Sequence, residues 1–266
     1  MDESAGPSLV RRAGSVWNRI VWEDDRMRLD GQVFRLEEVG TPPAVAPEEL
    51  RFFKNRAFVE SLMGFFRLRP EFQPQRILEM GIWEGGSVAF WNQVFRPLRH
   101  VAFDLAQRED SPEFRTWASR RAEPGSVETI WGVDQSDRSV VLDLARGKLR
   151  GAPDLIIDDA AHILECLQPA FETLFPLLRP GGIYLIEDWS WAHRAGAQDD
   201  DHFWRPYGDP TRLIFELVEA VATSGDIVAS VHLDPDWVAI ERGPRRIDDP
   251  LRFRVNEHIV RRETRR

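Results

Sequence analysis

Two short apolar runs in the middle of the chain each end abruptly in a pair of carboxylates. The first run covers residues 155–157 and the second covers residues 183–186. Unbroken apolar runs of this length are typical of parallel strands that are buried on both faces. Because ligands bind beyond the carboxyl ends of such strands, the acidic residues after each run are predicted to line a binding site.

Other apolar segments extend this pattern along the chain, with helical segments between them. Seven segments predict strands, at residues 77–80, 100–105, 127–133, 154–157, 183–186, 227–233 and 237–241. Strands that alternate with helices predict an α/β fold built on a doubly wound, mostly parallel sheet. We assign residues 76–242 to this main domain.

The residues before the main domain have a different character. Residues 1–16 contain Gly, Pro, Ser and Arg without periodicity and are expected to be mobile. Residues 17–75 are interpreted as a cap or an oligomerisation segment, which leaves a homo-oligomer open. The dipeptide Asp30-Gly31 predicts a hairpin turn, and a helix is predicted to start at Pro47. Its buried face is predicted to consist of Leu50, Phe53, Ala57, Ser61 and Phe65.

Composition and charge narrow the class of protein. The chain has 266 residues, 42% of them hydrophobic, and no run long enough to cross a bilayer. The N-terminus lacks the features of a signal peptide, and a single cysteine, Cys166, fits a reducing cytoplasm. A net charge of −9 predicts a surface that repels nucleic acid and anionic membranes. The Arg-rich tail, residues 243–266, is interpreted as a solvated end.

A glycine-rich loop follows the first strand of the main domain. It reads E-x-G-x-x-x-G-G from Glu79 and includes Gly81 and Gly85, whereas the dinucleotide fingerprint G-x-G-x-x-G is absent. Asp104 ends the next strand, where an acid accepts the hydroxyls of a ribose. The two features together predict a cofactor that contains a nucleoside. The alternative is a tight turn that binds nothing.

These motifs resemble those of class I S-adenosylmethionine-dependent methyltransferases over roughly residues 76–241. The segment Leu-Arg-Pro-Gly-Gly at residues 178–182 adds to the resemblance. It implies a Rossmann-like sheet of seven strands and S-adenosylmethionine as the cofactor. By resemblance, the cofactor-binding residues are Glu79, Gly81, Gly85, Ser87, Asp104, Asp134, Gln135 and Asp158.

The acids that follow the two apolar runs, Asp158, Asp159, Glu187 and Asp188, form an acidic rim that carries a narrower resemblance. The pattern D-D-x-x-H from Asp158 to His162, followed by Glu187-Asp188, is similar to the macrocin and mycinamicin sugar O-methyltransferases. It also resembles the rhamnosyl O-methyltransferases and the cephalosporin hydroxylase-like group. The sugar enzymes of this set depend on magnesium. The resemblance therefore implies Mg²⁺ or another hard divalent cation, and a glycosylated small molecule of antibiotic biosynthesis as the acceptor.

Electrostatics agrees with a metal at this rim. Neighbouring strands lie about 4.8 Å apart, so carboxylates at their ends repel one another unless a cation lies between them. Oxygen ligands suit Mg²⁺, and we predict that Asp159, Glu187 and Asp188 are the ligands. His162, three residues after Asp159, is predicted as the general base for a sugar hydroxyl. The alternatives are solvated or Arg-paired acids and a structural histidine.

Several functions remain open at this point. A catechol or other phenol is an alternative acceptor, and a cephalosporin hydroxylase-like protein or a non-catalytic scaffold would not transfer a methyl group. The loop at residues 189–207 is rich in Trp, Asp and His and is a candidate lid over the acceptor. Its aromatic residues could equally serve packing or a subunit contact.

Overall fold

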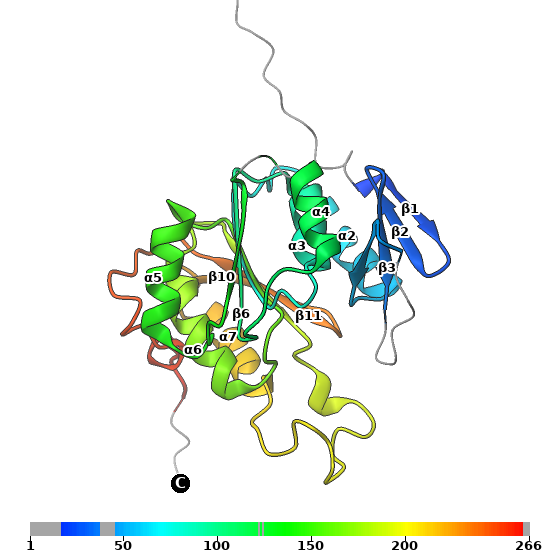
Figure 1. The fold of residues 1–266 in the computed structure, drawn as a ribbon. Coiled ribbons are helices and arrows are strands. Elements are labelled where there is room, and N and C mark those ends of the chain that lie inside the picture. Colours follow the sequence, from blue (N-terminus) through cyan, green and yellow to red (C-terminus); the bar gives the residue numbers. More distant parts are fainter. Residues whose placement is uncertain (1–16, 38–45, 122, 124, 263–266) are drawn as a thin grey trace, which may run out of the picture. The chain divides into compact units, whose positions relative to one another are not determined.

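The computed structural model describes residues 17–37, 46–121, 123 and 125–262. The chain divides into two compact units, Met1–Gln73 and Pro74–Arg266 (Figure 1). Residues 1–16, which we expected to be mobile, lie outside the described residues, as do the last four residues of the tail. Among the described helices, none has the length and apolar character that crossing a membrane requires.

The first unit contains a four-stranded sheet and one helix. The strands are β1 Ile20–Glu23, β2 Arg26–Leu29, β3 Gln32–Leu36 and β4 Glu49–Phe52, and the helix is α2 Arg56–Arg67. Strands β1 to β3 pair antiparallel, and β4 pairs parallel to β3. The predicted hairpin turn is confirmed, since Asp30 and Gly31 join β2 to β3 with positive φ angles of 49° and 78°. Such angles match the twist of the flanking strands.

The predicted start of the helix at Pro47 is wrong. Residues 49–52 form β4, in which burial alternates with a period of two, and Phe53 is 42% exposed. The helix begins after Asn55, whose side chain accepts a hydrogen bond from the Phe58 amide at 2.9 Å. The buried face of α2 is Phe58, Val59, Leu62, Met63, Phe65 and Phe66. A short strand followed closely by a helix gives an apolar pattern that is similar to that of one longer helix.

The second unit is built on a seven-stranded sheet, as predicted, in the order β10-β11-β9-β8-β5-β6-β7. The strands are β5 Arg76–Met80, β6 Arg99–Asp104, β7 Val127–Trp131, β8 Leu155–Asp158, β9 Ile183–Glu187, β10 Val228–Leu233 and β11 Trp237–Arg242. Strands β5 to β9 pair parallel to one another, whereas β11 pairs antiparallel to both β9 and β10. The sheet is therefore mostly parallel.

Helices cover both faces of this sheet. The helices are α3 Gly86–Phe95, α4 Pro112–Arg121, α5 Arg138–Leu149, α6 Leu164–Leu174 and α7 Thr211–Thr223, with short 3₁₀ helices η1 Phe175–Leu177, η2 Trp191–His193 and η3 Val255–His258. Figure 1 shows α3 and α4 on one side of the sheet and α5, α6 and α7 on the other. The tail is not solvated throughout, because Phe253 and Val255 are buried in the core.

The strand order places both acid pairs beside the glycine loop. The chain runs outward from β5 to β6 and β7, then returns to β8 and β9 on the other side of β5. The order therefore reverses between β5 and β8, which is where doubly wound sheets bind ligands. Met80 is level with Asp158, and Asp158 is level with Ile186. The ends of β5, β8 and β9 consequently meet at one edge.

A carboxyl group is buried at this edge, at the end of β8. The hydroxyl of Tyr184 donates to Asp158 Oδ2 at 2.9 Å, and the amide of Gln135 donates to Oδ1 at 3.2 Å. Burial raises the pKa of Asp158 to about 7 from its ordinary value of 3.8, and these two hydrogen bonds limit the rise. The neighbouring charge of Asp159 adds to it. An ionised Asp158 therefore costs the fold free energy.

We expect this buried carboxyl to make stability depend on pH. The pKa of Asp158 in the folded state lies above its unfolded value. Its contribution to the free energy of unfolding is therefore fully present below pH 3.8 and is lost as pH rises to about 7. At 1.36 kcal/mol per unit, the loss approaches ~4 kcal/mol. In EDTA, Asp158→Asn should gain stability relative to the native chain as pH rises from 4 to 8, measured by urea unfolding. The control Asp143→Asn, an exposed acid on α5, should follow the native profile. Parallel profiles for Asp158→Asn and the native chain would contradict the assignment.

Candidate active site

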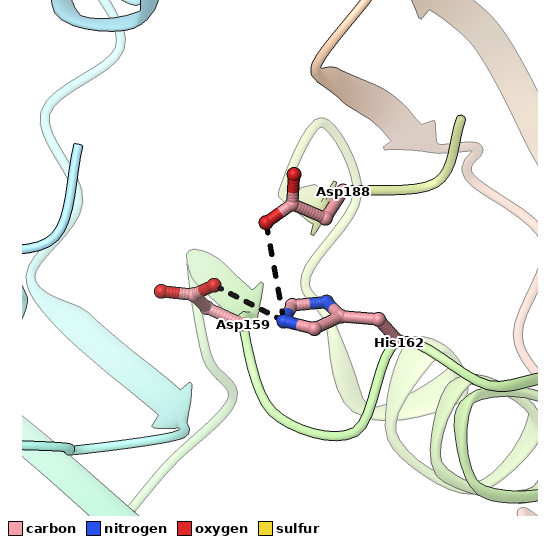
Figure 2. A group of neighbouring side chains, drawn as sticks. All are labelled: Asp159, His162 and Asp188. Carbon is pink, nitrogen blue, oxygen red and sulfur yellow. Dashed lines mark ion pairs between the residues drawn. The ribbon is translucent and has the colours of Figure 1, made fainter. Parts of the chain in front are cut away.

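Three side chains converge where β8 and β9 end. Asp159 and His162 lie in the loop after β8, and Asp188 follows β9. His162 Nε2 is 3.7 Å from Asp159 Oδ1 and 4.0 Å from Asp188 Oδ2. Figure 2 shows the two carboxylates facing the imidazole ring. One ligand atom from each residue lies within 4.8 Å of the others, and all three side chains are partly buried. Two carboxylates and an imidazole in this arrangement are a donor set that fits a divalent cation.

The other nitrogen of His162 fixes the orientation and the tautomer of the ring. Nδ1 lies 3.3 Å from the main-chain carbonyl oxygen of Glu187. A carbonyl oxygen can only accept, so we assign the proton to Nδ1. Nε2 is then left with its lone pair directed toward the two carboxylates. This nitrogen is available to take up a proton or to bind a cation.

The structure brings together two of the three predicted metal ligands. Glu187 is the last residue of β9, its side chain is only 1% exposed, and its carboxylate does not belong to the group around Asp159. Successive residues of a strand point to opposite faces, so two adjacent acids reach one site only where the strand ends. Asp188 adopts a left-handed conformation, with φ 50°, directly after the strand. That turn directs its carboxylate toward His162.

The glycine loop packs directly against the loop that carries Asp159. Gly81 has φ 89°, and a Cβ atom at this position would overlap the carbonyl oxygen of Asp159. In addition, the Asp159 amide donates to the Met80 carbonyl at 3.0 Å. Gly85 has φ 88°, and a Cβ there would overlap the ring of Phe114. Gly81 and Gly85 are therefore in close contact with other parts of the chain, and both positions require glycine.

Asp104 is bonded to the glycine loop through its side chain. Oδ2 accepts hydrogen bonds from the amides of Ile82 at 2.8 Å and Trp83 at 3.1 Å, and Oδ1 accepts from Ala106 at 2.8 Å. A carboxylate offers about four acceptor positions, so three backbone amides occupy most of them. The sequence did not indicate this role. Asp104 thus holds the loop in shape at the position where we expect the ribose.

The remaining predicted cofactor residues lie at different depths. Glu79 is fully buried, and its Oε2 is 2.8 Å from Nε2 of His100 on the neighbouring strand β6. Asp134 is exposed and accepts hydrogen bonds from the amide and hydroxyl of Ser136. Ser87 is partly buried in the first turn of α3.

Gln135 is buried between two parts of the site. Its amide nitrogen donates to Asp158, and its oxygen accepts from the Ala161 amide at 3.1 Å. Gln135 is one of the residues predicted to bind the cofactor. In the structure it links the end of β8 to the residue that precedes His162.

An arginine from the segment that follows β9 contacts the site, and no sequence motif indicates this contact. Arg194 donates to Asp236 Oδ1 at 2.6 Å and to Asp188 Oδ1 at 3.4 Å. Asp236 lies in the turn between β10 and β11, and its carbonyl accepts from the Asp188 amide at 2.7 Å. Asp188 is therefore held from its main chain and from its side chain.

Comparison with known proteins relates this site to one family. Residues 78–189 match the model of a methyltransferase domain. The chain is 39% identical to 8-demethyl-8-alpha-L-rhamnosyl tetracenomycin-C 2'-O-methyltransferase of Streptomyces olivaceus over 120 residues, which are 44% of its length. Over 159 residues, 56% of the chain, it is 31% identical to mycinamicin VI 2''-O-methyltransferase of Micromonospora griseorubida. These alignments span 28% and 36% of the relatives' own lengths, so the chain covers only about a third of each.

A solved structure shares the fold. The MycE methyltransferase of the mycinamycin biosynthetic pathway, in complex with Mg, SAH and mycinamycin VI, superposes with a TM-score of 0.55 at 25% sequence identity. The match covers 73% of this chain and 50% of MycE. The chain thus has the fold of class I methyltransferases, residues 78–189 match a methyltransferase domain, and part of the chain is similar to macrocin- and mycinamicin-type sugar O-methyltransferases.

Proposed function

We propose that this chain is a metal-dependent O-methyltransferase that transfers a methyl group from S-adenosylmethionine to a sugar hydroxyl of a glycosylated small molecule. The observation that carries the proposal is the convergence of Asp159, His162 and Asp188 beside the glycine loop. Relatives named as sugar O-methyltransferases support the acceptor class. The complex of MycE with Mg and SAH supports the metal and the cofactor.

The cation would be held by Asp159 and Asp188, with Glu187 as the third ligand predicted from the sequence. Asp159 and Asp188 already face each other across His162 Nε2. When bound, Mg²⁺ would lower the pKa of the sugar hydroxyl, which is otherwise a weak nucleophile. The two carboxylates would otherwise repel each other, and the cation compensates that charge.

His162 is the proposed general base. Its Nδ1–H donates to the Glu187 carbonyl, so Nε2 would be available to accept the proton of the acceptor hydroxyl. Nε2 lies within 4.0 Å of Asp159 and Asp188, so the proposed base and the proposed metal ligands could serve the same acceptor hydroxyl. Removing such a base typically slows a reaction by about 10²–10⁴-fold.

The glycine loop is the proposed cofactor site. S-adenosylmethionine, when bound, supplies an electrophilic methyl group on sulfur. Gly81, Gly85, Ser87, Asp104 and Asp134 would face it. Trp83, which is 60% exposed beside Asp104, adds apolar surface to this loop. The side chains of Glu79, Gln135 and Asp158 are buried, so these three residues would support the cofactor site from within the protein.

Cofactor binding is the first expected outcome. Titration calorimetry with S-adenosylhomocysteine should give a dissociation constant on the order of micromolar, about −8 kcal/mol. Asp104→Ala should weaken binding by ~1.5–3 kcal/mol, because the loop loses its anchor and the ribose an acceptor. Asp143→Asn on α5 should bind like the native chain. Absence of binding at millimolar ligand would contradict the proposed cofactor site.

Metal-dependent methylation is the second expected outcome. A panel of macrolide glycosides and rhamnosylated polyketides, incubated with S-adenosylmethionine, should contain a product heavier by one methylene group. EDTA should abolish the reaction and Mg²⁺ should restore it. Asp188→Asn should lower turnover by about 10²-fold or more, because one ligand is lost.

Matched controls separate this reading from its alternatives. Asp236→Asn changes a neighbouring carboxylate that also contacts Arg194 but lies outside the cluster, and it should stay within a few-fold of native turnover. A product heavier by one oxygen atom would indicate a hydroxylase-like reaction. Methylation of phenols alone would indicate the phenolic acceptor. Full activity in excess chelator would refute the metal role.

A further inference from the structure

The segment that follows β9 packs onto His162 from outside the matched methyltransferase region, which ends at residue 189. The indole N–H of Trp191, in η2, donates to the carbonyl oxygen of His162 at 2.7 Å. The ring of Trp204 meets the imidazole edge-on, with centroids 5.6 Å apart and planes at 76°. One tryptophan thus contacts the main chain of His162 and the other its ring.

His162 requires such support because its backbone is strained. Its φ is 54°, a left-handed conformation that non-glycine residues seldom adopt. Residues in such conformations persist only where surrounding contacts determine them. The described contacts of His162 fix separate parts of the residue. Glu187 holds Nδ1, Trp191 holds the carbonyl, and Trp204 packs on the ring.

The two tryptophans also support each other. Trp191 is 6% exposed and stacks on His202 with centroids 5.6 Å apart and planes at 9°. The rings of Trp191 and Trp204 lie 5.1 Å apart, and Trp204 is 6.0 Å from His202. The three rings contact one another, with Trp191 buried and His202 and Trp204 partly exposed, and aromatic side chains offer large contact areas. The orientation of His162 therefore depends on this aromatic cluster, Trp191, His202 and Trp204.

We propose that Trp191 and Trp204 are positioning residues, which hold His162 in its left-handed conformation with Nε2 directed at Asp159 and Asp188. The consequence for catalysis rests on the proposed function, in which His162 is the base. The consequence for the ring does not. A base displaced by about 1 Å can cost 10²-fold in rate, so loss of the aromatic cluster should lower turnover although the cluster does not itself take up the proton.

A matched pair of substitutions tests this positioning. Trp191→Phe keeps an aromatic ring and removes the N–H that His162 accepts from. Trp189→Phe removes the same group from the same segment, but that N–H donates to the Asp234 carbonyl at 2.8 Å. Trp191→Phe should lower kcat by about 10–100-fold, with KM and cofactor affinity within about twofold of native. Trp189→Phe should leave kcat within about twofold.

A second readout does not require activity. In ¹⁵N-correlated NMR spectra at alkaline pH, the native His162 ring, assigned by its loss in His162→Gln, should show one tautomer with the proton on Nδ1. Trp191→Phe should give mixed tautomers or a broadened signal, whereas Trp189→Phe should give the native spectrum. Should Trp191→Phe fail to fold, Trp204→Leu, at a partly exposed position, should disturb the same signal.

The outcomes separate the two proposals. If the native chain has no methyltransferase activity but Trp191→Phe disturbs the His162 signal, the positioning role is supported and the proposed function is refuted. Native spectra and native kcat in Trp191→Phe and Trp204→Leu would overturn the positioning role while the proposed function stands. Equal losses of kcat in Trp191→Phe and Trp189→Phe, with native spectra in both, would also overturn it.

Discussion

The close approach of Gly81 to the main chain of Asp159 is the contact on which the rest of the site depends. A side chain at Gly81 would overlap the Asp159 carbonyl, so this position must be glycine for the two loops to meet. The hydrogen bond from the Asp159 amide to Met80 fixes the same junction. Asp104 then shapes the glycine loop from the next strand, because three backbone amides donate to its carboxylate. One junction of two strand ends thus couples the proposed cofactor site to the acidic rim.

Charge is the second constraint, because the reversal of strand order concentrates acids in a small volume. Asp158 is buried, with its pKa raised to about 7, and the charge of the neighbouring Asp159 contributes to that rise. Asp188, directly after β9, approaches the imidazole of His162, which Asp159 also approaches. The chain offsets part of this charge with Arg194, which contacts Asp188 from outside. A bound cation would offset more of it, which explains why an arrangement that costs stability is useful.

Much of the fold could be predicted from the sequence, whereas the detailed roles of the site residues could not. Buried parallel strands leave unbroken apolar runs, so the sheet and the acids at its edge were predictable. The strand Glu49–Phe52 was missed because four residues before a helix fit a helical pattern as well. Gln135 was assigned to the cofactor, although its side chain bridges Asp158 and Ala161. The hydrogen bond from Trp191 to His162 joins residues 29 positions apart, and no local pattern signals such a contact.

The central claim is that Asp159 and Asp188 hold a divalent cation next to His162. A crystal grown with Mn²⁺ and S-adenosylhomocysteine, measured at the manganese absorption edge, tests it most directly. The account predicts one anomalous peak within bonding distance of carboxylate oxygens of both Asp159 and Asp188, with the His162 ring beside it and its Nδ1 still at the Glu187 carbonyl. Clear cofactor density without any anomalous peak between these two carboxylates would contradict the account.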